Sequence, residues 1–204
     1  MQSSLFEDGG AEEAESLDEL NAEIFEQGKA RYPNRVFILG TGPANAEVVI
    51  VGESPGPPDV ATGKPFSGPS GELLERMMSA IEVRLEDCYR TNVVKFISQG
   101  DEITQTELQF FTPLLLREIL SISPKIIILL GNTPSKAVLS TKTPISKLRG
   151  QVHDFQGIKA VATFNPAYLL RDPTKKREAW EDMKLVREVL NGRGPEPTYF
   201  PSEM

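Results

Sequence analysis

Three polar side chains stand in or directly after strand-like runs of the sequence, where parallel strands usually carry their chemistry. Glu53 follows the apolar run VVIV, Asn92 lies in the run 89–95, and Asn165 follows the run VATF. A carboxylate stabilises a developing positive charge or positions water, and an asparagine amide presents both a hydrogen-bond donor and an acceptor. If the runs are neighbouring strands, the three side chains converge on one rim of a sheet and form a candidate site.

Each of these side chains also has a plain structural interpretation that the sequence leaves open. Glu53 can cap a local backbone turn, and Asn92 can bond the backbone at the end of a strand. Asn165 can cap the turn before Pro166, a position where asparagine is common.

Hydrophobic periodicity predicts the elements that must position these groups. Strands are expected at residues 36–39, 47–51, 89–95, 125–130, 151–155 and 158–164. Helical spacing and capping signals predict helices at residues 16–30, 70–81, 104–121, 133–139 and 174–190. Strands that alternate with helices predict an α/β fold, a three-layer α/β/α sandwich with a mostly parallel central sheet.

Single residues refine this outline. Thr133 fits an N-cap for the helix that follows it, and Pro113 is expected to kink or break its helix. Gln156-Gly157 predicts a hairpin turn or tight connection, residues 165–173 a loop, and Trp180 a core position in the last helix.

The connection at residues 52–68 is long for an α/β unit, whose links usually take about two to six residues. It has Glu53 at its start and Phe66 near its end. It lacks both the G-x-G-x-x-G spacing and the Gly-Lys-Ser/Thr of a P-loop, so neither nucleotide-binding motif is present. A functional loop is therefore expected, with Phe66 as a plain core anchor left as the alternative.

The composition indicates one folded domain with tails, since 39% of the 204 residues are hydrophobic and 25% are charged. We expect a disordered acidic tail at 1–15, a single domain at 16–192 and a loose tail at 193–204. No apolar run approaches the ~18 residues of a membrane helix, and the N-terminus is acidic where a signal peptide is basic. The expectation is a cytoplasmic monomer without a membrane partner.

The net charge of −7 hides an uneven distribution. Residues 1–26 hold nine acidic residues and no Lys or Arg, which leaves 22 basic against 20 acidic residues in the remainder. Residues 142–177 hold eight basic residues against Asp154 and Asp172. That stretch can meet a phosphate backbone or form a solvated surface, so charge alone leaves the partner open.

Three motifs add a family resemblance. The first comprises residues 52–56 (GESPG), 63–68 (GKPFSG) and 71–74 (GELL), the second residues 91–95 (TNVVK), and the third residues 165–171 (NPAYLLR). In order and spacing, over about residues 33–190, they resemble the family-four uracil-DNA glycosylases. The resemblance implies an enzyme that flips uracil out of single- or double-stranded DNA and hydrolyses its N-glycosidic bond, the first step of base excision repair.

The resemblance also implies roles in the base pocket. Phe66 would stack on the flipped uracil and Asn92 would read its O4 and N3–H, with Gly52 also in the substrate site. Glu53 would be the catalytic carboxylate beside the oxocarbenium-like sugar, and Asp59, later in the loop, is the second candidate.

Contacts to DNA follow from the same resemblance. Polar contacts to phosphates near a helix N-terminus are expected from three residues: Ser67, Gly68 and Ser70. Leu169 and Leu170 would wedge into the gap left by the flipped nucleotide, with ordinary core packing as the alternative for one of them. Arg171 is expected on a phosphate.

The chain departs from the family pattern at the iron site. The family holds a four-iron cluster on four cysteines, and this chain has one cysteine, Cys88. One thiol cannot hold such a cluster, so we expect no cofactor and no metal. Packing of Phe25, Phe96 and Phe111 into the volume of the cluster is the expected substitute.

A second departure is Asn165, which stands where the family has histidine. In the family this side chain faces uracil O2, where negative charge develops as the base leaves. Asparagine can donate a hydrogen bond there, although it lacks the proton-transfer chemistry of imidazole. An Asn-Pro motif also occurs in the mismatch-specific branch of the superfamily. His153, the only histidine of the chain, is given no chemistry.

Three other functions stay open. They are a glycosylase of the same fold for another lesion, such as a deaminated purine or a mismatch, a non-catalytic nucleic-acid-binding homologue, and a small-molecule hydrolase. The presence of Glu53, Phe66 and Asn92 argues against the binding-only interpretation, because binding does not need a pocket that reads uracil.

Overall fold

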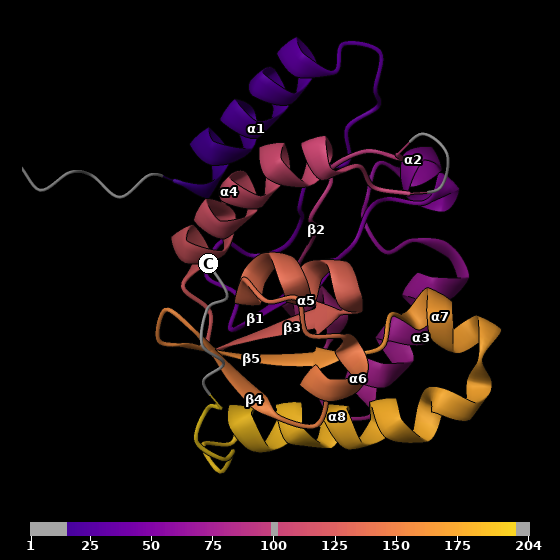
Figure 1. Ribbon diagram of the computed structural model, residues 1–204, viewed down its shortest axis with the longest axis vertical. Helices are drawn as coiled ribbons and strands as arrows, with labels where there is room; N and C mark the ends of the chain where they lie inside the picture. The colour runs from indigo at the N-terminus through magenta and orange to yellow at the C-terminus, as the bar shows by residue number, and fades with distance from the viewer. Residues whose placement is uncertain (1–15, 99–101, 199–204) are drawn as a thin grey trace, which may run out of the picture.

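A five-stranded sheet forms the middle of the molecule (Figure 1). The computed structural model describes residues 16–98 and 102–198. The strands are β1 (Val48–Gly52), β2 (Tyr89–Asn92), β3 (Ile126–Leu130), β4 (Val152–Phe155) and β5 (Ile158–Thr163). They lie in the order β2-β1-β3-β5-β4, and all neighbours are parallel except the antiparallel β4–β5 hairpin. The predicted mostly parallel α/β architecture is confirmed.

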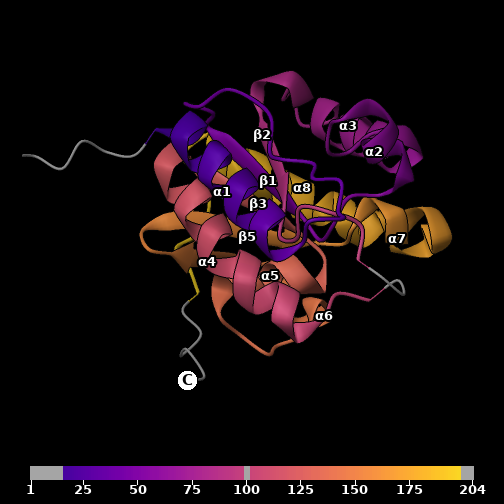
Figure 2. The same ribbon diagram turned by 90° about the horizontal axis from the view of Figure 1, so that it is seen from above.

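Helices cover both faces of this sheet. They are α1 (Leu17–Arg31), α2 (Pro57–Thr62), α3 (Gly68–Ser79), α4 (Gln105–Ile122), α5 (Asn132–Leu139), α6 (Ile145–Leu148), α7 (Pro166–Arg171) and α8 (Lys176–Leu190), with 3-10 turns η1 (Leu85–Asp87) and η3 (Pro173–Lys175). Val49 and Val51 of β1 share one core with α1, α4 and α5. Val48 and Ile50 point the other way and pack with α3 and α8. Seen from above, α1 and α4 lie across the sheet from α3 and α8 (Figure 2).

The capping signals place the starts of two long helices. Ser16 and Glu19 exchange hydrogen bonds at the start of α1, and Thr104 and Glu107 do the same at α4. The predicted break at Pro113 is absent, because α4 runs on through it to Ile122. Pro113 lies on the exposed face of α4. Because proline has no N–H, the carbonyl four residues before it lacks its helical donor, and water can bond that carbonyl instead.

The predicted strand at residues 36–39 is wrong. Val36 is 58% exposed, and the segment forms no continuous ladder. It is tied to the sheet at separate points instead. The Ile38 N–H donates to the Lys95 carbonyl, and Thr41 exchanges two backbone hydrogen bonds with Arg90. Of the apolar residues at 36–39 that suggested a strand, only Ile38 is buried, and the segment is an irregular connection.

Two segments predicted as loops contain helices. Residues 57–62 form α2 inside the long connection, and residues 166–171 form α7, each with proline in its first turn. The predicted cap of α5 also moves, because Gly131 is the N-cap and Thr133 lies within the helix. The hairpin turn at Gln156-Gly157 is confirmed by the β4–β5 pairing.

An aromatic cluster forms in the core and contains two of the three phenylalanines expected there, Phe96 and Phe111. Phe96 and Phe111 are fully buried with ring centroids 5.5 Å apart. Tyr32 and Phe37 pack against them, with centroids 4.9 and 5.5 Å from that of Phe96, and the Phe110 centroid lies 4.9 Å from that of Phe111. Phe25 is 38% exposed and reaches only Phe37, because Ile24 takes the core-facing position of α1.

This aromatic cluster makes a stability prediction. Phe111→Ala is expected to lower the free energy of unfolding by about 3–5 kcal/mol, the usual cost of deleting a buried phenyl ring. Phe25→Ala, the same substitution at a half-exposed ring, is the control and is expected to cost much less. Urea denaturation of both variants measures the difference, and equal losses would contradict the packing described here.

Other segments complete the comparison with the sequence. Trp180 is 38% exposed, so its predicted core position is wrong. Residues 193–204 were expected to be loose, but the described part of this segment ends at the sheet. There the Thr198 N–H donates to the Val152 carbonyl. The acidic tail at 1–15 and residues 199–204 lie outside the described residues. Among the described residues, no helix combines the length and apolar character needed to cross a membrane.

Candidate functional site

The three polar side chains meet at the carboxyl edge of the sheet, as the strand ends predict. Gly52 pairs with Asn92 across β1 and β2, which puts Glu53 beside the end of β2. Asn165 follows β5 two strands away. A cavity of about 130 Å³ opens between these loops, and Glu53, Phe66, Asn92 and Asn165 all line it.

The floor of this cavity is built by close packing around Gly52. A Cβ atom at Gly52 would collide with Asn92 Oδ1 and would lie 2.7 Å from Phe66 Cζ. The absence of a side chain therefore lets the amide and the ring share one pocket. The sequence placed all three residues in the substrate site, and the structure brings them together.

Phe66 is held in an uncommon backbone conformation, with φ at 59°. Its carbonyl oxygen lies against Gly71 of α3, where any Cβ would overlap it. On one side the half-buried ring packs against the core of α3 and β1. Core anchor and pocket wall are therefore compatible roles for this residue.

Asn92 offers a buried amide without a protein partner. Asn92 is 3% exposed, its backbone pairs with Gly52, and its carbonyl accepts from Lys95 Nζ at 2.9 Å, while no hydrogen bond within the described residues engages its side-chain amide. A buried amide normally finds hydrogen bonds. This one lines the cavity with its donor and acceptor unused, which is the arrangement that a ligand with a complementary edge would satisfy.

Glu53 is anchored by a residue far away in the sequence. Thr133 Oγ1, in the first turn of α5, donates to Glu53 Oε2 at 2.7 Å. The Glu53 carbonyl accepts from the Val94 N–H at 3.0 Å, so the backbone is fixed as well. The other carboxylate oxygen has no hydrogen bond from the described part of the chain. Sequence reasoning missed Thr133, because its only local signal was that of a cap.

Asp59 has different hydrogen-bond partners from Glu53. Its two carboxylate oxygens accept from the backbone N–H groups of Gly56, at 2.8 Å, and Ser67, at 2.6 Å. Asp59 is 7% exposed and ties Gly56, the N-cap of α2, to Ser67, the N-cap of α3. These bonds support a role in shaping the loop rather than the catalytic role considered for Asp59 as second candidate.

Asn165 is both a cap and a pocket residue. Its Oδ1 accepts from the Ala167 N–H at 2.8 Å at the start of α7. With the oxygen held in this way, the Nδ2 amide is the group left to donate, and no hydrogen bond engages it in residues 16–98 or 102–198. The two interpretations of Asn165 from sequence are therefore compatible.

The residues predicted to contact DNA lie around this cavity in unequal environments. Ser67 and Ser70 both line the cavity, but Ser67 already uses its N–H on Asp59 and its hydroxyl on the Lys64 carbonyl. Gly68 begins α3 with φ at 70°, a conformation that favours glycine.

Only one of the two leucines of α7 is available for contact. Leu169 is 1% exposed and belongs to the core, which agrees with the alternative of ordinary packing, while Leu170 is 41% exposed. Arg171 is exposed and lines a second cavity of about 590 Å³ together with Lys175 and Glu53. This wider cavity adjoins the smaller one through their shared residues Glu53 and Asn165.

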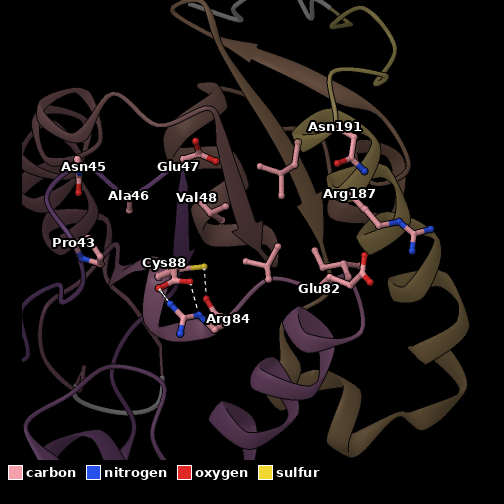
Figure 3. A pocket seen from close by; sticks show the side chains of 14 residues that line it. Pro43, Asn45, Ala46, Glu47, Val48, Glu82, Arg84, Cys88, Arg187 and Asn191 are labelled. Carbon is pink, nitrogen blue, oxygen red and sulfur yellow. Dashed lines mark hydrogen bonds and ion pairs between the residues drawn. The ribbon is translucent and has the colours of Figure 1, made fainter.

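Another cavity, of about 790 Å³, lies away from these loops at the start of β1 (Figure 3). Among its charged residues, Arg84 pairs with Asp87 and also with the neighbouring Glu86. Burial raises the pKa of the Cys88 thiol to about 12, so this group is not a nucleophile near neutral pH. It donates instead to the Arg84 carbonyl. The chemistry therefore points to the smaller cavity.

The residues present do not fit a cluster ligated by four thiolates. Cys88 is the only cysteine of the chain and is buried beside η1, at the other end of the sheet from the aromatic cluster's Phe96. No group of three or more His, Cys, Asp or Glu side chains in the described residues has the arrangement of a metal site. His153 is buried, which lowers its pKa, and its Nε2 bonds the Leu148 carbonyl.

Comparison with known proteins agrees with this geometry. Residues 39–184 match the family model of the uracil DNA glycosylase superfamily. The chain is 31% identical over 197 residues to the type-4 uracil-DNA glycosylase of Archaeoglobus fulgidus, which covers 91% of this chain and 98% of that protein. It is 35% identical over 162 residues to the type-4 enzyme of Thermotoga maritima, covering 77% of this chain and 84% of that protein. The chain therefore belongs to the uracil-DNA glycosylase superfamily, and its similarity there is to the type-4 enzymes.

Proposed function

We propose that this protein is a monofunctional DNA glycosylase that hydrolyses the N-glycosidic bond of uracil in DNA. The observation that carries the proposal is the unpartnered, buried Asn92 amide, which shares one small cavity with the Phe66 ring, the Glu53 carboxylate and the Asn165 amide. The type-4 relatives, named as uracil-DNA glycosylases, support the same substrate.

Base selection follows from the chemistry of Asn92. Its Nδ2 can donate to uracil O4 while its Oδ1 accepts from N3–H. Cytosine carries an amino donor at position 4 and an acceptor at N3. In the same pose, the Asn92 Nδ2 would face the amino group and the Asn92 Oδ1 would face N3, so neither hydrogen bond could form. The contacts of Gly52 with this amide and with Phe66 fix the amide beside the ring on which the base stacks.

Bond cleavage uses the other two groups. As the C1′–N1 bond breaks, its electron pair leaves with the base and the sugar becomes oxocarbenium-like. The Glu53 carboxylate stabilises that cation and orients the water that adds to C1′. The water loses a proton to solvent as it adds, and the departed uracil anion takes up one proton from solvent. The Asn165 Nδ2 donates to uracil O2, which takes up the negative charge of the leaving base.

A base inside a duplex is inaccessible, so the nucleotide must leave the stack first. Leu170 is an exposed apolar side chain of α7, the helix whose first residues line the cavity, and is suited to fill the gap. Arg171 and Lys175, on the rim of the adjoining cavity, are suited to phosphates of the bent strand.

One assay tests the proposal directly. Oligonucleotides with a single uracil, hypoxanthine or xanthine, in single strands and opposite each normal base, are incubated with the protein, and abasic sites are then cleaved with alkali. We expect cleavage at uracil. Cleavage only at a purine lesion or a mismatch would establish the alternative lesion specificity suggested by Asn165, and binding without cleavage of any substrate would establish the non-catalytic alternative.

The hydroxyl of Thr133 is expected to matter for the chemical step. Thr133→Val keeps the shape of the side chain but removes the hydrogen bond to Glu53, and we expect kcat for uracil excision to fall about 10- to 100-fold, the effect of losing a hydrogen bond to a charged group. Thr133→Ser restores the hydroxyl and should restore most of kcat. If the valine variant keeps the wild-type kcat in single-turnover assays, Glu53 does not depend on this bond.

A further inference from the structure

A fully buried ion pair lies behind the strand that carries Asn92. Lys95 Nζ is 2.5 Å from Glu118 Oε2, and both side chains have no exposed surface. Glu118 comes from α4, which packs over the face of the sheet shared with α1 (Figure 2). The pair therefore joins a helix in one layer to the turn that follows β2.

Hydrogen bonds from β2 converge on this pair. Glu118 Oε1 accepts from the Tyr89 hydroxyl at 2.7 Å and from the Thr91 hydroxyl at 3.0 Å. Lys95 Nζ donates to Thr91 Oγ1 at 2.5 Å and to the Asn92 carbonyl at 2.9 Å. The chain at Gly40 closes over the group, since a Cβ there would collide with both Tyr89 and Glu118.

Stability is a poor explanation for such a pair. Moving two charges out of water costs as much as or more than their attraction returns, and apolar side chains of similar size often stabilise a fold equally well. A buried pair with all its hydrogen bonds made does, however, fix geometry strongly. We therefore ask which part of the backbone the Lys95–Glu118 pair fixes in place.

What it holds is the peptide group that follows Asn92. The carbonyl of this peptide accepts from Lys95 Nζ, and its N–H, which belongs to Val93, donates to the Gly52 carbonyl at 2.9 Å. With both ends engaged, the peptide plane cannot rotate. The direction in which the Asn92 side chain leaves the backbone is thereby set relative to Gly52 and the pocket.

We propose that Lys95 and Glu118 are positioning residues that set the Asn92 amide for base recognition. This inference rests on the proposed function. Lys95 and Glu118 would affect the base only through Asn92. The inference predicts a loss of base affinity, with a smaller effect on the chemical step, because the Glu53 carboxylate is held separately by Thr133 and Asn165 lies on another loop.

The test is the double variant Lys95→Met/Glu118→Gln. It removes both charges together, so neither is left buried alone, and the glutamine oxygen can still accept from Tyr89 and Thr91. The donor to the Asn92 carbonyl is lost. We expect a folded protein whose KM for uracil-containing DNA rises about tenfold, the effect of one net hydrogen bond, with kcat changed less.

The matched control is Arg117→Met/Glu23→Gln, which removes a half-exposed ion pair between the same helix, α4, and α1. It is expected to keep the wild-type KM and kcat. Should the first double variant fail to fold, Thr91→Val takes its place, because it deletes only the hydroxyl shared by Lys95 and Glu118. Its KM should shift in the same direction.

A second readout does not depend on uracil. The Asn92 side-chain amide, assigned in ¹⁵N–¹H spectra by its loss in Asn92→Ser, should shift and the Val93 N–H should exchange faster in the Lys95→Met/Glu118→Gln protein. A wild-type protein that excises no uracil would contradict the proposed function, while these spectra would still test the positioning. An unchanged KM together with unchanged Asn92 and Val93 signals would overturn the inference.

Discussion

Glu53→Gln is expected to lower the rate of uracil excision by about 10²–10⁴, the range found for removal of a catalytic acid or base. The change keeps the shape of the side chain and an oxygen that can still accept from Thr133, so the hydrogen bond at 2.7 Å has a replacement. What is lost is the negative charge opposite the oxocarbenium-like sugar. Single-turnover cleavage of a uracil oligonucleotide, with affinity for uracil-free DNA measured beside it, separates this loss from a binding defect.

The control makes the same chemical change at a distance from the site. Glu82→Gln alters an exposed carboxylate beside the large cavity at the other end of the sheet (Figure 3), so its excision rate should equal that of the wild type. A Glu53→Gln protein with a wild-type rate and an unchanged melting temperature would remove Glu53 from the mechanism. Asp59→Asn is expected instead to lower the melting temperature, since Asp59 bonds two backbone N–H groups of the loop.

The sequence predicts the sheet and the convergence of the site well, for a physical reason. A run such as Val48–Val51 is apolar on both faces, and only a strand covered by helices on both sides buries all of it. Polar residues directly after such strands must then lie on one edge. Glu53, Asn92 and Asn165 were placed together by this argument, and the structure lines one cavity with all three.

The sequence cannot predict contacts that depend on elements far apart in the chain. Thr133 and Glu53 are separated by 80 positions, and Lys95 and Glu118 by 23, so no local pattern pairs them. Asp59 illustrates a related limit. A carboxylate in a long loop looks available for catalysis until α2 forms between Gly56 and Ser67 and gives it two N–H partners.

Helix phase explains the remaining differences. Leu169 and Leu170 are equivalent in sequence, and only the formation of α7 turns the first into the core and the second toward solvent. In the same way Ile24 takes the buried position of α1 and leaves Phe25 exposed, so Tyr32 and Phe37 fill the aromatic cluster instead.

Asn165→Ala is expected to lower uracil excision by about 10²–10³, the usual cost of one hydrogen-bond donor to a developing negative charge. It also removes a helix cap, because Asn165 Oδ1 bonds the Ala167 N–H, so the variant should lose about 0.5–2 kcal/mol of stability as well. Alanine alone therefore cannot tell a capping residue from a donor, and two further variants at the same position are needed.

Asn165→Asp keeps a good N-cap but replaces the Nδ2 donor with a second acceptor. If Asn165 serves only as the cap, this variant should keep both its melting temperature and its excision rate. If Asn165 donates to uracil O2, the melting temperature should hold while excision falls at least as far as in the alanine variant, since a carboxylate would then face the negative charge of the leaving base. Asn165→His supplies the family's own group before Pro166 and is expected to keep or raise excision. A histidine variant that is folded but inactive, beside an aspartate variant of full activity, would show that this loop does not face the leaving base.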